Sequence, residues 1–424
     1  MANSGAVVVG MGFGDEGKGT ITDFLCSQRE VDYVVRYSGG PQTAHNVVTD
    51  NGRHHTFAQF GSGTFQGVPT ILSRYMLVNP FNMVVEAGHL FDKIGSNPME
   101  KTYISEHALM ITPLHVAVNR YREELRGANA HGSCGEGIGE TRSWAIRNPD
   151  RAITVGDLLE TRASNWDVLK ENMNAYLSAI QEELPGFVYD GSIDGIIDGY
   201  KDMLQDCPFN IVPDEWISQR LRVSNYVVFE GSQGILLDED FGFHPHTTWS
   251  AVTDRNARTL VEEAGLDYTA YERIGITRTY TTRHGFGPFP SEFGGDKWQE
   301  HYPEDFNAYG RYQGSWRAGL LDLTLLEYAV KVNKGFDAIA LTHADINVTG
   351  VVTGYKQFAE IVPVGKKDLD YQETLTNMLN ASKGEQIVKP VFSTDEVIKE
   401  IEQRLGVPVR IVSSGPTAKD KVLR

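Results

Sequence analysis

A short valine-rich run followed at once by a glycine-rich turn is the feature that most limits how this chain can fold. Residues 6–10 read Ala-Val-Val-Val-Gly, and residues 12–19 read Gly-Phe-Gly-Asp-Glu-Gly-Lys-Gly. From Thr20 to Cys26 the apolar residues recur at helical spacing. A buried strand, a glycine loop and a helix in this order predict the opening βα unit of a phosphate-binding α/β fold.

Apolar runs of the same kind recur along the chain, and turn residues flank each of them. Such runs are typical of strands buried on both faces of a parallel or mixed sheet. We expect strands at residues 33–36, 226–229, 338–341 and 409–412. Helical patterns lie between them, at residues 114–125, 165–183, 254–264 and 322–332. The sequence therefore predicts an α/β fold with a large, mostly parallel central sheet and surrounding helices.

One segment, residues 286–319, is rich in glycine, proline and aromatic residues, and its pattern predicts an irregular functional loop or lid. The chain contains no internal repeat, low-complexity tract or clear linker. We therefore expect residues 1–424 to form a single domain with helical and lid-loop insertions.

The charge balance limits the classes of partner. The chain has 39 Lys and Arg against 56 Asp and Glu, a formal net charge of −17, which is not the electrostatic footprint of a nucleic-acid binder. No apolar run approaches the ~18–20 residues that a membrane span needs. Three widely separated cysteines argue against a disulfide framework or a zinc knuckle. We expect a cytoplasmic protein with neither nucleic-acid nor membrane partners.

The glycine loop has the spacing of a P-loop up to Lys18, but Gly19 stands where Ser or Thr would hold magnesium. Backbone N–H groups and the helix N-terminus can bind phosphate oxygens, and Lys18 adds a positive charge. Asp15 and Glu16 lie inside this loop, where carboxylates are costly beside a polyanion unless one binds a cation and the other does chemistry. A glycine-rich turn with solvated acids is the simpler alternative.

The loop, read as Gly14-Asp-Glu-Gly-Lys-Gly19 after a valine-rich strand, resembles the signature of adenylosuccinate synthetases, which are purine-pathway ligases. Further blocks resemble that family in the same order, at residues 39–46, 132–139, 155–158, 229–238, 282–290, 341–345 and 413–416. The resemblance implies a two-step reaction. A nucleoside triphosphate phosphorylates the 6-oxygen of a purine monophosphate such as IMP, and the amine of L-aspartate then displaces the phosphate to give adenylosuccinate.

The resemblance implies chemical roles for three residues. Asp15 matches the base that takes the N1 proton and also binds Mg²⁺. His45 lies in the motif that supplies a proton or hydrogen-bond donor to the 6-oxygen and the moving phosphoryl group. Gln233 follows a predicted strand, and in the family this glutamine holds the 6-oxygen. A core histidine and a helix-capping glutamine are the structural alternatives.

The other site residues follow from the resemblance position by position. The implied triphosphate-binding residues are Gly14, Glu16, Gly17, Lys18, Gly19, Asp345, Ser414 and Gly415. The implied purine monophosphate-binding residues are Gln42, Ser133, Cys134, Arg147, Gln233 and Thr248. The backbone carbonyl of Ala44 is a second expected Mg²⁺ ligand.

Two of these positions bear on partners. Asp345 suits guanine, because a carboxylate can accept hydrogen bonds from N1–H and the 2-amino group, but His343 replaces the family lysine and ATP stays an alternative to GTP. Arg147 lies near the position of an arginine that family members donate across a dimer interface. The resemblance thus implies a homodimer, and an exposed surface arginine is the alternative.

The expected amino-acid site departs most from the family. The family has four arginines where residues 309–322 keep Arg311 and Arg317, and His284 replaces a valine beside this loop. A dicarboxylate needs charge-assisted, preferably bidentate donors. We therefore assign Arg311, Arg317 and His284 to aspartate binding.

Other functions stay open at this stage. The same chemistry on GMP or dGMP would give 2-aminoadenylosuccinate, as in some phage relatives, but these have serine in place of the loop aspartate and this chain keeps Asp15. A pseudoenzyme that only binds nucleotides would not need both Asp15 and His45. An unrelated P-loop phosphotransferase or GTPase would need Ser or Thr where Gly19 stands.

Overall fold

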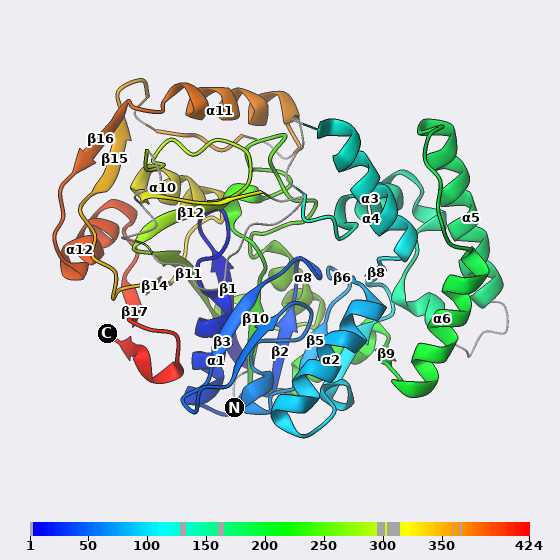
Figure 1. Cartoon of the computed structure of the whole chain (residues 1–424). Helices are drawn as coiled ribbons and strands as arrows, with labels where there is room; N and C mark the ends of the chain where they lie inside the picture. Colours follow the sequence, from blue (N-terminus) through cyan, green and yellow to red (C-terminus); the bar gives the residue numbers. More distant parts are fainter. Residues whose placement is uncertain are drawn as a thin grey trace.

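A ten-stranded sheet forms the centre of the molecule (Figure 1). The computed structural model describes residues 3–127, 133–159, 165–294, 302, 314–358, 360–364 and 367–424. The strand order is β18-β17-β14-β11-β1-β10-β2-β5-β7-β9. Every neighbouring pair is parallel except β17 and β18, which are antiparallel. The predicted large, mostly parallel sheet is confirmed.

The strands of this sheet are β1 (Ser4–Gly10), β2 (Tyr33–Arg36), β5 (Thr70–Leu72), β7 (Thr102–Ser105), β9 (Asn210–Val212), β10 (Tyr226–Glu230), β11 (Tyr271–Arg278), β14 (Ala338–Thr342), β17 (Val409–Ser413) and β18 (Lys421–Leu423). A second sheet has the order β12 (Tyr280–His284), β13 (Trp316–Asp322), β15 (Val351–Tyr355) and β16 (Gln386–Lys389). Two small pairs are β3 (His45–Val48) with β4 (His54–Phe57), and β6 (Leu77–Val78) with β8 (Leu109–Met110).

The helices are α1 (Lys18–Gln28), α2 (Pro80–Ile94), α3 (Pro113–Arg126), α4 (Ile138–Arg147), α5 (Asn165–Glu183), α6 (Ile193–Asp206), α7 (Asp214–Val223), α8 (Arg255–Glu263), α10 (Leu323–Val332), α11 (Leu369–Ala381) and α12 (Thr394–Leu405). Each predicted strand and helix is present within a few residues of its expected ends. The predicted irregular segment 286–319 is wrong at its end, because β13 begins at Trp316. Pairing with β12 supplies the backbone partners that make this segment a strand.

The valine-rich run of β1 lies at the middle of the sheet because both of its faces are covered. Val7 and Val9 pack into one apolar cluster and Ala6 and Val8 into another, as the alternation of side chains along a strand requires. All four are at most 1% exposed. This burial on both faces is the reason that the run is continuously apolar.

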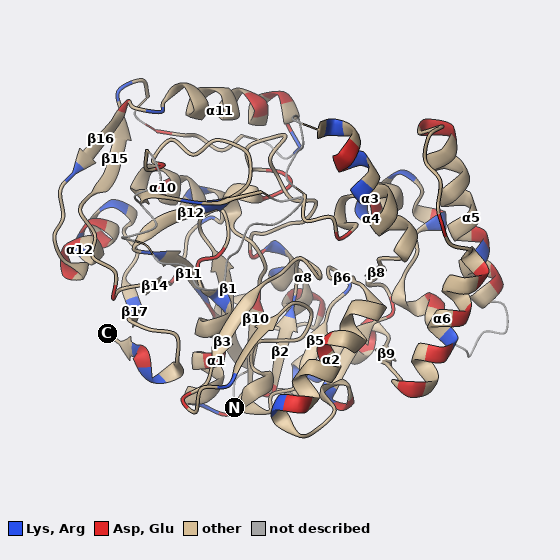
Figure 2. Cartoon of the chain, viewed as in Figure 1, with Lys and Arg blue, Asp and Glu red and all other residues tan. Residues whose placement is uncertain are grey.

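A third apolar cluster joins α2, α3, α5 and α6, which lie to one side of the sheet (Figure 1). Figure 2 shows acidic and basic residues interspersed on the outer helices α5, α6 and α12. Among the described residues, no helix is both long enough and apolar enough to cross a membrane.

Candidate active site

The glycine loop after β1 has the conformation of an anion-binding turn. Gly14, Asp15 and Gly17 have positive φ angles of 98°, 60° and 94°. Gly17 caps α1 in the left-handed conformation, and no side chain caps the first turn of this helix. Backbone N–H groups at such an uncapped helix start attract phosphate oxygens. The structure therefore presents the predicted phosphate loop in a suitable conformation.

Gly19 is a glycine because His45 packs directly against it. A Cβ atom added at Gly19 would lie 2.6 Å from the Cβ atom of His45. Ser or Thr would clash at this position, so the chain has exchanged the magnesium-binding hydroxyl of a P-loop for close contact with a histidine. This packing argues against the P-loop phosphotransferase or GTPase alternative.

Glu16 folds back into the loop that carries it. Its Oε1 atom accepts hydrogen bonds from the backbone N–H groups of Gly12 at 2.9 Å and Gly14 at 2.8 Å. Its Oε2 atom lies 2.5 Å from the Nζ atom of Lys18, and both side chains are at most 5% exposed. Glu16 braces the loop and neutralises Lys18 in this conformation. A direct contact of Glu16 with a triphosphate stays a prediction.

His45, at the start of β3, forms a buried pair with Glu230 at the end of β10. The Nδ1 atom of His45 lies 2.7 Å from Oε1 of Glu230. Burial lowers the pKa of His45, although Glu230 opposes this effect. The neutral imidazole therefore carries its proton on Nδ1, facing the carboxylate. The Nε2 atom is buried and has no hydrogen-bond partner among the described residues.

Glu230 is held by further groups that the sequence analysis did not select. Its carboxylate accepts hydrogen bonds from the backbone N–H of Ser62 at 3.0 Å and from the Ser62 hydroxyl. The Nε atom of Arg36 lies 4.0 Å away. Burial raises the pKa of Glu230, but His45 and Arg36 outweigh this and the net pKa is lowered. A charged residue ending an otherwise apolar strand was the sequence signal that could have identified Glu230.

Gln233 and Thr248, both predicted to bind the purine monophosphate, lie together. Nε2 of Gln233 donates to the Thr248 hydroxyl at 2.8 Å, and the hydroxyl of Ser250 donates to Oε1 of Gln233 at 3.3 Å. Gln233 has a positive φ of 61°. The side-chain nitrogen and oxygen of Gln42 are buried without a partner among the described residues, as expected of groups that meet a polar ligand.

The segment before α4 carries the next predicted phosphate-binding residues. The Oγ atom of Ser133 accepts a hydrogen bond from Nδ2 of Asn119 at 3.0 Å. Burial raises the pKa of Cys134 to about 12, so its thiol is protonated at neutral pH. The segment approaches Thr248 through Gly139, where an added Cβ would lie 3.0 Å from the ring of Trp249.

Arg147, the last residue of α4, is exposed. Its Nε donates to the carbonyl of Ser143 at 3.4 Å. Its guanidinium therefore lies on the surface of the chain. This position suits both an arginine that reaches a partner subunit and an ordinary surface arginine.

Asp345, Ser414 and Gly415 follow the neighbouring strands β14 and β17. The two loops are joined by a hydrogen bond of 2.9 Å from the Ala344 N–H to the Ser413 carbonyl. Asp345 and Ser414 are exposed. Because parallel strands end at the same edge of a sheet, these residues lie at the edge that carries the glycine loop.

The two described residues of the predicted amino-acid site have different partners in the structure. Arg311 lies outside the described residues. Arg317 makes a bidentate ion pair with Glu292, with N–O distances of 2.7 and 2.9 Å, and donates to the carbonyls of Gly285 and Gly287. His284 instead contacts the loop carboxylate, since its Nε2 lies 3.0 Å from Oδ2 of Asp15.

The expected Mg²⁺ ligands fit an open site better than a protein cage. No group of three or more His, Cys, Asp or Glu that could hold a metal occurs in the described part of the chain. Mg²⁺ is usually bound by one or two carboxylates together with substrate phosphates and water. The Asp15 carboxylate is 20% exposed, and Ala44 is exposed. One carboxylate and one carbonyl beside a phosphate loop suit that kind of binding.

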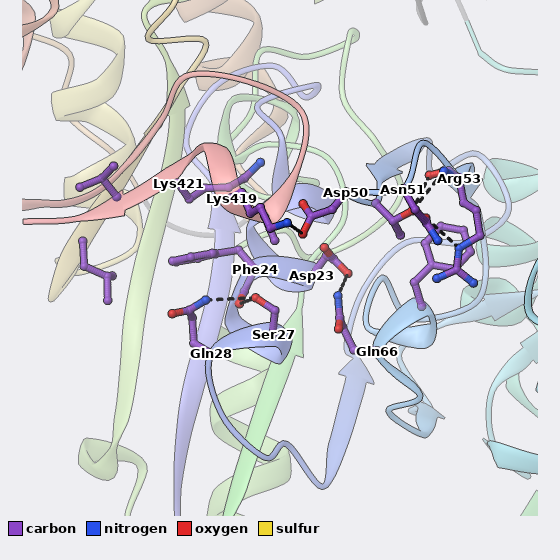
Figure 3. A pocket seen from close by; sticks show the side chains of 15 residues that line it. Asp23, Phe24, Ser27, Gln28, Asp50, Asn51, Arg53, Gln66, Lys419 and Lys421 are labelled. Atoms are coloured by element: carbon purple, nitrogen blue, oxygen red, sulfur yellow. Dashed lines mark hydrogen bonds and ion pairs between the residues drawn. The ribbon is translucent and has the colours of Figure 1, made fainter.

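A cavity of about 690 Å³ lies beside α1 and is lined by this helix, the turn before β4 and the C-terminal segment (Figure 3). Several charges that line it are paired within the chain. Lys419 contacts Asp50 at 3.0 Å, and Gln66 donates to Asp23 at 2.9 Å. Lys421 connects this cavity to the site, because its Nζ donates to the carbonyl of Gly415 at 3.0 Å. The predicted catalytic residues do not line this cavity.

The glycine loop, its carboxylate Asp15 and the His45–Glu230 pair meet at the carboxyl edge of a parallel sheet. This arrangement defines a nucleotide-dependent α/β enzyme. The family model described as adenylosuccinate synthetase matches residues 7–422. The chain belongs to the adenylosuccinate synthetase family, whose enzymes are ligases that form a C–N bond, and the resemblance inferred from the motifs is confirmed.

Relatives of known function match over almost their full length. The adenylosuccinate synthetase of Buchnera aphidicola subsp. Schizaphis graminum is 30% identical over 451 residues, covering 99% of this chain and 98% of the relative. That of Bdellovibrio bacteriovorus is 31% identical over 433 residues, covering 97% and 96%.

Solved structures confirm the fold. The fully ligated adenylosuccinate synthetase of Plasmodium falciparum has a TM-score of 0.80 at 20% identity and covers 100% of both chains. The succinoaminodeoxyadenylate synthetase of cyanophage S-2L, bound to dGMP and dATP, has a TM-score of 0.64 at 16% identity and covers 100% of this chain and 96% of its own.

Proposed function

We propose that this protein joins L-aspartate to the 6-position of IMP, with consumption of a nucleoside triphosphate, and releases adenylosuccinate. The observation that carries the proposal is the position of His45 beside the phosphate loop, with a buried Nε2 atom that has no partner in the described part of the chain. A histidine serving only the core would have its second nitrogen satisfied or facing apolar groups. A substrate oxygen is the partner that this atom lacks.

In the first step, Asp15 takes the N1 proton of the purine and negative charge develops on the 6-oxygen. That oxygen attacks the γ-phosphorus of the triphosphate, and the nucleoside diphosphate leaves. The negative charge that develops on this oxygen favours uptake of a solvent proton at Nε2 of His45, which is neutral in the free protein, and Nε2 then donates toward the oxygen and the moving phosphoryl group. The carboxylate of Glu230 stabilises the imidazolium through Nδ1. Asp15 and the Ala44 carbonyl would hold Mg²⁺, which when bound would neutralise charge on the phosphates.

In the second step, the amine of aspartate attacks C6. A C–N bond forms, the C–O bond to the phosphoryl group breaks, and orthophosphate and the amine proton leave. Gln233 orients the 6-oxygen before this exchange, and the Gln233–Thr248 hydrogen bond of 2.8 Å supports its position. Arg311 and Arg317 are the proposed carboxylate partners, on condition that the substrate carboxylate replaces Glu292 beside Arg317.

The remaining assignments rest on the resemblance and on position. We propose that Gln42, Ser133, Cys134 and Thr248 bind the purine monophosphate, and that Gly14, Glu16, Gly17, Lys18 and Gly19 bind the triphosphate. Asp345, Ser414 and Gly415 would bind its base. We also propose a homodimer in which the exposed Arg147 reaches the partner's site. Light scattering of the purified protein, with and without nucleotides, tests the dimer.

A second candidate is the same chemistry on dGMP, which the cyanophage protein binds in its solved structure. The retained Asp15 favours IMP, because the resemblance gives serine at this position in the phage relatives that act on dGMP. The test is a matrix of IMP, GMP and dGMP against GTP, ATP and dATP with aspartate, followed by product mass. We expect adenylosuccinate from IMP. Product from GMP or dGMP alone would favour the second candidate, and nucleotide binding without any product would identify a pseudoenzyme.

A further inference from the structure

We propose that His284 is a positioning residue that holds the carboxylate of Asp15 for the first chemical step, and that it does not belong to the amino-acid site. The inference rests on the proposed function, in which Asp15 is the base. It reassigns a residue whose position in the sequence had suggested contact with aspartate.

The contact itself is direct. The Nε2 atom of His284 lies 3.0 Å from Oδ2 of Asp15, and the two side chains are 14% and 20% exposed. An imidazole N–H donor at this distance makes a charge-assisted hydrogen bond with a carboxylate. The contact thus holds the Asp15 carboxylate through its Oδ2 atom.

Strand β12 aims His284 at the loop. Thr282 and His284 are two residues apart and therefore lie on the same face of the strand. The hydroxyl of Thr282 donates to the carbonyl of Gly14 at 3.2 Å, and His284 contacts the next residue, Asp15. This face of β12 thus contacts two successive residues of the glycine loop. The His284–Asp15 contact is therefore part of a more extended packing of the strand against the loop.

The backbone of Asp15 is fixed from another strand. Nε of Arg278, the last residue of β11, donates to the carbonyl of Asp15. The φ angle of Asp15 is 60°, in the left-handed region. With the backbone held there, the side-chain torsion decides where the carboxylate points. His284 contacts Oδ2 and so leaves Oδ1 for the substrate. This positioning matters because a base acts in the transition state only when it lies close to the proton that it removes.

Arg317 binds a carboxylate without help from His284. The guanidinium of Arg317 is already bound by Glu292 and by the carbonyls of Gly285 and Gly287. His284 therefore contacts the proposed base, Asp15, whereas Arg317 contacts Glu292.

The first half of the reaction separates the two roles, since it needs no aspartate. With oxygen-18 in the β,γ-bridge of the triphosphate and IMP present, reversible phosphoryl transfer moves the label to the β non-bridge positions. We expect His284→Val to slow both this scrambling and kcat by roughly 10–100-fold, from loss of one charged hydrogen bond. The KM values for aspartate and nucleotides should stay within about threefold of wild type.

Two matched amides test the hydrogen bond itself. His284→Gln carries its amide nitrogen near the Nε2 position and should restore scrambling to within about fivefold of wild type. His284→Asn carries its amide nitrogen near the Nδ1 position, which is too short to reach Asp15, and should behave like His284→Val. The Gln–Asn comparison decides the question even if His284→Val fails to fold, and thermal unfolding of both amide variants controls for stability.

Normal scrambling in His284→Val with a raised aspartate KM would overturn the inference and return His284 to the amino-acid site. Equal rates in the Gln and Asn variants would also overturn it. A wild-type protein that makes no product from IMP would overturn the proposed function, and with it this inference, before any variant is compared.

Discussion

The Nδ1 atom of His45 lies 2.7 Å from Oε1 of Glu230, and these side chains are 7% and 0% exposed. A carboxylate buried this deeply needs partners, and the histidine is one of them together with Ser62 and Arg36. The arrangement orients the imidazole and leaves its Nε2 directed away from Glu230. His45 thus has two roles, since its Nδ1 atom is a partner for the buried Glu230 carboxylate and its Nε2 atom is proposed to act on the 6-oxygen.

Removing the loop carboxylate should stop turnover. We expect Asp15→Ala to lower kcat by at least about 10²–10⁴-fold, the usual cost of losing a general base, with a further loss if Mg²⁺ binding is weakened. Binding of IMP, measured by calorimetry, should largely persist because the carboxylate is not its main anchor. A kcat within about threefold of wild type would remove Asp15 from the mechanism.

The His45–Glu230 pair should behave as one unit. His45→Asn and Glu230→Gln should each lower kcat steeply and leave the nucleotide KM values nearly unchanged, as expected of groups that act in the transition state. Because Glu230 acts through His45, the double variant should be little worse than His45→Asn alone. Additive losses in the double variant, or a large loss of thermal stability with normal kcat in His45→Asn, would instead indicate a structural histidine.

Arg317 and Glu292 should affect aspartate in opposite directions. Arg317→Ala should raise the aspartate KM by roughly 10–100-fold, from loss of a charged hydrogen-bond pair of ~1.5–3 kcal/mol. Glu292→Gln removes the carboxylate that now occupies the guanidinium, so the aspartate KM should fall or stay constant. If both variants lose activity equally, Arg317 anchors the loop through Gly285 and Gly287 and does not bind the substrate.

The contribution of Asp23 to stability should be less favourable at neutral pH than at acid pH. Burial raises the pKa of Asp23 to about 6, and its side chain accepts a hydrogen bond from Gln66. The folded state therefore holds a proton that the unfolded chain releases near pH ~4, and this contribution to stability is lost as the pH rises from about 4 to about 6.

Asp23→Asn keeps an oxygen acceptor for Gln66 without the charge. It should raise the free energy of unfolding by about 1–3 kcal/mol at pH 7.5 and change it little at pH 4. Urea unfolding at the two pH values measures the difference. An equal effect at both pH values would show that burial does not raise the pKa of Asp23 in the folded protein.

The fold was largely accessible from local patterns. The run from Ala6 to Gly10 is apolar at every position because both faces of β1 are covered, and Gly14 and Gly17 after it adopt the positive φ angles that glycine favours. Patterns of this kind depend on near neighbours in the chain. They predicted the central strands and the main helices within a few residues, whereas the division into one domain over 1–424 stays a prediction.

The pairing of site residues was not accessible in this way. Residues that contact each other here are far apart in sequence, as with His45 and Glu230, Asp15 and His284, or Arg317 and Glu292. Sequence motifs identified one or both members of each pair, but they did not show that the two residues contact each other. His284 was assigned to aspartate binding because it stands beside the arginine loop in the chain, whereas in the structure its Nε2 atom contacts the carboxylate of Asp15.

The phosphate loop, the sheet and the family can be predicted from the sequence, since they depend on the order of residue types along short segments. Tertiary contacts alone show which nitrogen of His45 has no partner among the described residues, which carboxylate binds Arg317 and why position 19 has no side chain. Such contacts form where distant strands end at one edge of the sheet, and their distances follow from packing that no local pattern contains.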